Sequence, residues 1–264
     1  MRRKLTLGFV TVVFSLACVA HSPNRESQRQ ANDEVSRGEN SFRNAQYVQA
    51  IDHFKKATAL DPALFQARLD LLATAYFRIS TSDKDSPDFK EIGDQAIAAF
   101  QDVLKNDPQN PIALSNIAMI DYVEQNFQKA KEIWEDLRKV EPNNPQAYYW
   151  IGVSDWSMVY PKIQKARAGL GLTTPRDWTK PGILPSLPDS ARAQLRAENG
   201  ALIDDGIKAL EKASELMPHY KDAMAYLNLL YRLKADTEEN KTDSGADIKN
   251  ADELVDQIRA QQSR

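Results

Sequence analysis

Residues 111–144 read PIALSNIAMIDYVEQNFQKAKEIWEDLRKVEPNN, and this stretch of the sequence decides the fold. It places small and apolar residues at fixed positions ahead of Pro142, and comparable stretches end at Pro62, Pro108 and Pro218. The intervals between these prolines are 46, 34 and 76 residues, which fit one unit of 34 residues with two insertions. A period of about 34 residues is typical of stacked helical hairpins, none of which buries its apolar face alone. The sequence therefore predicts an all-α solenoid.

The first unit shows the steric logic of such a hairpin. Residues 34–42 and 48–60 carry apolar or small residues at three- and four-residue spacing, and residues 44–46 interrupt the pattern. Small residues stand where two antiparallel helices must approach, an aromatic ring fills the space beside them, and a proline stops the second helix. These residues are Gly38, Ala50, Phe54, Ala57 and Pro62. This order of residue types resembles the tetratricopeptide repeat, and the third unit repeats it with Ala118, Ala130, Trp134, Leu137 and Pro142.

The resemblance implies a tetratricopeptide-like α-solenoid of about five helical hairpins over residues 33–234. The expected units cover residues 31–64, 65–110, 111–144, 145–220 and 221–234 onward, with an insertion over residues 160–200 in the fourth. Residues 235–264 are expected to form a polar loop and a C-terminal capping helix, because the last unit of a solenoid needs a polar outer face.

The first twenty residues are typical of an export signal. Three of the first four residues, Arg2, Arg3 and Lys4, are basic, and the next 16 residues, from Leu5 to Ala20, carry no charge. The only cysteine, Cys18, lies in a context that resembles a bacterial lipobox, so one alternative is cleavage before Cys18 and lipidation of its thiol. The other alternative is cleavage after Ala20. Residues 21–32 are polar and are expected to be a flexible tether between the anchor and the first helix. From the export signal we expect a periplasmic protein, and from the first alternative a membrane-anchored lipoprotein.

The amino-acid composition argues against nucleic-acid binding, metal binding and catalysis. Removal of the first 17 residues, which hold three basic and no acidic side chains, lowers the formal net charge from −3 to −6, and nucleic acid is therefore a poor partner. The three histidines, His21, His53 and His219, show no metal-ligand spacing. The sequence also lacks a glycine-rich phosphate loop and a pair of cysteines. We therefore expect no catalytic residues, no metal and no cofactor.

Aromatic residues recur where the resemblance implies a concave binding surface. In tetratricopeptide repeats the first helix of each unit lines the concave side, and its twelfth position points inward. The residues at that position here are Phe42, Tyr76, Tyr122 and Trp156, and Met119, Tyr149, Trp150 and Tyr226 lie nearby on the same helices. Such a groove is suited to an apolar or amphipathic peptide. About half of these rings are expected to pack between neighbouring helices instead, and a small-molecule or glycan ligand is the alternative occupant.

The resemblance also bears on the kind of peptide. Chaperone-binding members of the family hold a terminal carboxylate with lysine, asparagine and arginine side chains. The matching positions of the third unit lack lysine and arginine and hold Ile112, Ser115, Asn116 and Met119. Capture of an acidic C-terminus by this route is therefore not expected.

The insertion over residues 160–200 is the second candidate site. It is rich in proline and locally basic, with Lys162, Lys165 and Arg167 near its start. Arg176 and Trp178 are its candidate contact residues, either in a lid over the groove or in a strap that fills it, and the need to bury Trp178 favours the strap. By analogy with exported members of the family, the expected role is a non-enzymatic scaffold that binds a protein or peptide during assembly of an envelope complex.

Overall fold

The structure is a computed structural model that describes residues 24–64, 68–69, 71–75, 78, 87–172 and 186–262. The described residues form α-helices and short turns, without a strand. The helices are α1 (Arg25–Arg43), α2 (Tyr47–Leu60), α4 (Pro87–Asn106), α5 (Pro111–Val123), α6 (Phe127–Val140), α7 (Pro145–Gly169), α8 (Asp189–Leu216), α9 (Lys221–Thr237) and α10 (Lys241–Gln262). No helix in this described part of the chain is both long and apolar enough to cross a bilayer.

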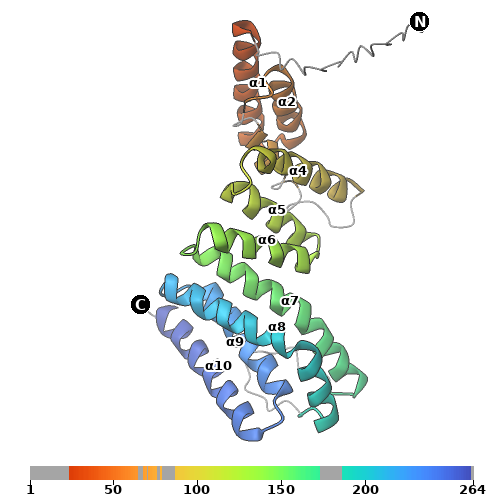
Figure 1. Cartoon of the computed structure of the whole chain (residues 1–264), viewed down its shortest axis with the longest axis vertical. Helices are drawn as coiled ribbons and strands as arrows, with labels where there is room; N and C mark the ends of the chain where they lie inside the picture. The colour runs from red at the N-terminus through yellow and green to blue at the C-terminus, as the bar shows by residue number, and fades with distance from the viewer. Residues whose placement is uncertain are drawn as a thin grey trace, which may run out of the picture.

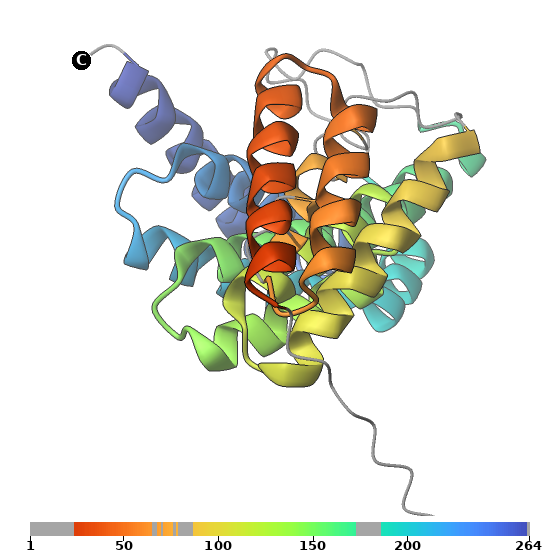
Figure 2. The ribbon, with the colours of Figure 1, turned by 90° about the horizontal axis from the view of Figure 1, so that it is seen from above.

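The helices are stacked in chain order along the long axis of the molecule (Figure 1). Along most of the stack each helix packs against the next, from α4 on α5 through to α9 on α10, and α1 packs on α2. The helix α7 also contacts α9, so the first helices of the fourth and fifth hairpins touch each other. Seen from above, α1 (red) and α2 (orange) lie side by side in front of the later helices (Figure 2). The prediction of an all-α solenoid is confirmed.

Helix starts follow from local capping. The side chains of Asn24, Asn110 and Asn144 each accept a hydrogen bond from a backbone N–H in the first turn of α1, α5 and α7. Pro111 and Pro145 occupy the first position of their helices, where the missing N–H leaves no hydrogen bond unmade. The sequence motif Asn-Pro thus starts the first helix of both the third and the fourth hairpin.

The small residues of the repeat are buried where the helices approach most closely. A Cβ on Gly38 would lie 2.4 Å from a ring carbon of Phe54, so only glycine lets α1 and α2 pack at this distance. Between α7 and α8, a Cβ on Gly152 would lie 2.9 Å from the carbonyl oxygen of Gly206. Close contact between these hairpin helices therefore depends on the absence of a side chain at one position in each pair.

The first helix begins earlier than the sequence predicts. Residues 21–32 are expected to be a tether, but α1 starts at Arg25. The cause is local: Asn24 caps the helix, and the Glu26 side chain accepts hydrogen bonds from Arg29 and Gln30 one turn later. In addition, Ala31 is fully buried, so this turn belongs to the packed first hairpin.

Much of the fourth-unit insertion is helical rather than a loop. The helix α7 continues through Pro161 to Gly169, and α8 starts at Asp189, so both helices of this hairpin extend beyond the repeat. The extension is held by tertiary contacts: Val159 and Ile163 are fully buried, and the buried Arg167 pairs with Asp236 of α9. This burial outweighs the backbone hydrogen bond that Pro161 cannot donate. The basic character of the insertion is accordingly reduced, because Arg167 is neutralised internally.

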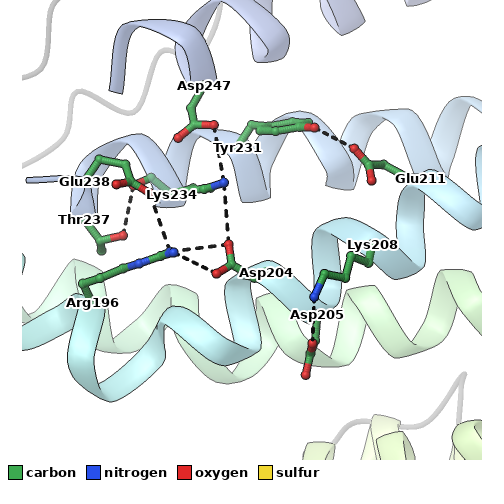
Figure 3. A network of polar contacts seen from close by, with 10 residues as sticks. All are labelled: Arg196, Asp204, Asp205, Lys208, Glu211, Tyr231, Lys234, Thr237, Glu238 and Asp247. Atoms are coloured by element: carbon green, nitrogen blue, oxygen red, sulfur yellow. Dashed lines mark hydrogen bonds and ion pairs between the residues drawn. The ribbon is translucent and has the colours of Figure 1, made fainter. Parts of the chain in front are cut away.

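The C-terminal hairpin also differs from the expected polar gap. The helix α9 runs to Thr237 and α10 starts at Lys241, so the polar loop expected at the start of residues 235–264 is reduced to a short turn. A polar network fixes this junction (Figure 3): Arg196 and Asp204 of α8 are paired, and Lys234 of α9 lies between Asp204 and Asp247 of α10. Asp247 is buried whereas Ile248 is exposed, so α10 docks partly through an ion pair and not only through its apolar stripe.

Candidate functional site: the first-helix face

The helix α5 and the first part of α7, residues 145–160, have almost no charged residues. Within Pro111–Val123 the only one is Asp121, and within residues 145–160 the only one is Asp155. Both carboxylates are buried, with exposed fractions of 5% and 0%. By contrast, half of the residues of the neighbouring helix α6 are charged. The solvent side of α5 and of the first half of α7 therefore carries no exposed ionic group.

Aromatic rings from three first helices are in contact on this side. We call the surface made by Ile112, Met119, Tyr122, Tyr149, Trp156 and Tyr226 the first-helix face. The Tyr122 ring lies 4.9 Å from the Trp150 ring, edge to face, and joins α5 to α7. Tyr149 and Trp156 of α7 lie 5.9 and 5.3 Å from Tyr226 of α9. Each of these rings is partly buried, so part of each ring packs against the protein and part is open to solvent.

Hydroxyl groups on the face are fixed by neighbours. The Ser157 hydroxyl donates a hydrogen bond to the carbonyl oxygen of Val153 at 2.8 Å, so at its 3.0 Å contact with the Tyr122 hydroxyl it is the acceptor. Burial raises the pKa of Tyr149, and the nearby Tyr226 hydroxyl adds to the effect. Burial likewise raises the pKa of Tyr226. These phenols stay protonated and neutral at physiological pH.

Apolar surface completes the face at its α5 end. Ile112 is 50% exposed, and Met119, two turns along the same side of α5, is partly buried against the core around Trp134 and Leu137. Large exposed apolar side chains on a helix with no charged neighbours on that side favour contact with an apolar partner. The α5 and α7 parts of the face therefore combine apolar, aromatic and hydroxyl groups without an exposed charge, whereas exposed Asp222 of α9 lies near its Tyr149–Tyr226 end.

Comparison with known proteins agrees with this repeat architecture. A model of the tetratricopeptide repeat matches residues 93–150, which cover most of α4, α5, α6 and the start of α7. Residues 93–150 therefore form tetratricopeptide repeats. No curated protein sequence matches it significantly.

Solved structures of similar fold align with most of this chain. One is described as the MamA RS-1 ArsTM double mutant, with a TM-score of 0.56 and 16% sequence identity over 89% of this chain and 98% of that chain. A second is MamA 41-end from Desulfovibrio magneticus RS-1, with a TM-score of 0.54 and 14% identity over 86% of this chain and 96% of that one. At these identities the likeness concerns the fold alone.

The structure separates the predicted groove residues of the tetratricopeptide repeats into two places. Tyr122, Tyr149 and Trp156 lie together on the first-helix face, with Met119 beside them. Phe42 lies in the first repeat, 5.6 Å from the Tyr47 ring, and lines a cavity of about 250 Å³ together with Glu39, Arg43, Phe54, Ala73 and Thr74. The remaining predicted site residues, Cys18, Tyr76, Arg176 and Trp178, lie outside the described residues.

Two aromatic residues of the repeats were not among the sequence candidates. Tyr160 stacks on Trp156 with ring centroids 4.8 Å apart, and its position four residues later on the same helix could have revealed it. Tyr220 lies 5.1 Å from Tyr149, but it precedes α9 in a turn, so helical spacing gives no signal for it. Among the described residues, no group of three or more histidine, cysteine, aspartate or glutamate side chains could hold a metal ion.

Proposed function

We propose that the first-helix face binds an apolar or amphipathic segment of another protein, and that the protein acts as a non-enzymatic scaffold. The observation that carries the proposal is the absence of exposed charge on α5 and on residues 145–160 of α7, next to a strongly charged α6. Neutral aromatic and apolar side chains give a large contact area for little lost rotamer freedom. The tetratricopeptide repeat fold supports a protein partner rather than a small molecule.

Two exposed apolar residues provide a matched test. Ile112 on α5 and Val48 on α2 are 50% and 55% exposed, but only Ile112 belongs to the first-helix face. We expect a photocrosslinking amino acid at position 112 to capture a defined protein partner in intact cells, and the same amino acid at position 48 to capture none. Ile112→Glu should abolish copurification of that partner, whereas Val48→Glu should not. Equal crosslinking at both positions, or full copurification by Ile112→Glu, would exclude this face as the binding surface.

We further propose that the scaffold works in the bacterial cell envelope, anchored by a lipid on Cys18. The support is the basic and then uncharged N-terminal sequence and the lipobox-like context of Cys18. Export through this signal would place the first-helix face outside the cytoplasm, where it could serve assembly of an envelope complex. Labelled fatty acid should enter the wild-type protein and not Cys18→Ser, and the variant should leave the membrane fraction. A wild-type protein without label, or a variant that stays membrane-bound, would refute the anchor.

A further inference from the structure

A buried ion pair lies where the third repeat meets the fourth. Asp155 of α7 is fully buried, and the ammonium group of Lys131 on α6 donates a hydrogen bond to its Oδ1 at 2.8 Å. The Lys131 side chain is 9% exposed, so its charged end is also nearly removed from water. Burial of two charges is unfavourable unless both are fully satisfied by partners.

Asp155 is not fully satisfied. Its second oxygen, Oδ2, is buried and has no hydrogen-bond partner among the described residues. The space beside it is closed by α8, since a Cβ placed on Gly206 would lie 3.5 Å from Oδ2 and 3.0 Å from the Asp155 Cβ. A buried oxygen that accepts no hydrogen bond destabilises the ionised carboxylate relative to the protonated one.

The charges around Asp155 act in opposite directions. Lys131 on α6 favours the carboxylate, whereas Glu135 on α6 and Asp205 on α8 repel it. Burial is the largest effect, and together these influences raise the pKa of Asp155 to about 7. Asp155 lies on α7 and contacts both α6 and α8, so a change in its protonation state acts on the packing of all three helices.

We propose that the joint between α6, α7 and α8 responds to pH by uptake of one proton on Asp155, which weakens the ion pair with Lys131. The proton is taken from solvent by the carboxylate, and no other group changes charge. The Lys131 ammonium is then released from Asp155, and the long apolar stem of the side chain lets it reach water. Since Asp155 directly precedes Trp156, this change alters the stacking of the third repeat on the fourth beneath the first-helix face.

Tryptophan fluorescence of the full chain provides the test. Trp156 adjoins Asp155, and Trp134 lies one turn after Lys131. We expect a one-proton transition in emission centred near pH 7 in the wild type, which Asp155→Asn abolishes. Lys131→Met should move the midpoint upward, because it removes the cation that favours the carboxylate. The control His53→Gln should keep the transition, since His53 lies on α2 in the first hairpin.

A second measurement uses only the wild-type protein, so its outcome does not depend on whether a variant folds. In the wild-type protein labelled with ¹³C at aspartate carboxyl carbons, one resonance should titrate near pH 7. A titration in which every aspartate resonance changes below pH 5 would overturn the proposal. Retention of the fluorescence transition by a folded Asp155→Asn variant would overturn it as well.

Discussion

Gly152→Ala should destabilise the protein even though alanine is the better helix former. Gly152 lies inside α7, where Gly→Ala normally stabilises a helix by about 1 kcal/mol. Here the added Cβ would lie 2.5 Å from the Leu210 Cγ and 2.9 Å from the backbone oxygen of Gly206. The oxygen belongs to α8 and cannot move without the helix. Overpacking of this kind costs about 1–3 kcal/mol, and with two such contacts we take the upper end.

The expected net loss in the free energy of unfolding is therefore about 2 kcal/mol, which lowers the Tm by about 4–8 °C in a chain of this size. The matched control is Gly245→Ala, because Gly245 lies inside α10 and a Cβ there would meet nothing within 4 Å. This control should gain about 1 kcal/mol from helix propensity alone.

Differential scanning calorimetry and urea titration of both variants measure the two shifts. The reasoning requires opposite signs at the two glycines. A Gly152→Ala variant that is as stable as the wild type, or more stable, would mean that α7 and α8 do not approach as closely as the structure shows. A loss at Gly245 would mean that α10 is not a regular helix at that position.

Three further changes test other parts of the fold. Asn110→Ala removes the cap of α5 and should cost about 1 kcal/mol in a urea titration, whereas Asn110→Asp should keep most of the stability. The hydrogen bond from His53 lowers the pKa of Glu34 below its usual 4.5. The ionised Glu34 therefore stabilises the fold at pH values above 4.5, and this stabilisation is lost as the pH falls through the lower pKa of the folded state. The Tm difference between wild type and Glu34→Gln should accordingly shrink in acid. Arg167→Met leaves Asp236 without its cation and should cost about 3 kcal/mol, and the double variant Arg167→Met/Asp236→Leu should recover part of this loss in thermal unfolding.

The repeat core could be predicted from the sequence because its determinants are local and periodic. Gly38 and Phe54 stand at fixed spacing within one hairpin, and their contact follows from the short turn between two helices. The same holds for Ala118, Ala130 and Trp134 in the third repeat, which are all buried. At these positions residue size alone determines the packing distance between helices.

The extensions of the fourth and fifth hairpins could not be predicted in this way, because they depend on contacts between distant residues. Arg167 is 69 residues from Asp236 in sequence, and nothing in its neighbourhood indicates that it is buried. A proline in the helix, at Pro161, and the polar stretch after Thr237 favour loops by local propensity. At Pro161, burial against α9 outweighs the preference for a loop. After Thr237, the pairing of Asp247 with Lys234 holds α10 in place.

The candidate site was predictable in its residue types and less so in its geometry. The twelfth-position rule selects Tyr122 and Trp156, and both lie on the first-helix face. The contact of Tyr149 with Tyr220 and Tyr226 requires the fourth and fifth repeats to stack across the insertion, so it depends on the tertiary structure. The lack of exposed charge on α5 and on residues 145–160 of α7 is visible in the sequence, but it gains meaning only when the two carboxylates in these stretches, Asp121 and Asp155, are known to be buried.

The stacking of helices mainly on their chain neighbours has a mechanical consequence. In a solenoid held together repeat by repeat, a stretching force applied at the two ends acts on the hairpins in series. The helix α7 contacts α6, α8 and α9, so the fourth and fifth hairpins share contacts beyond those between chain neighbours. Under tension the hairpins should separate one after another, and the block of α7, α8 and α9, in which all three helices contact one another, should separate last.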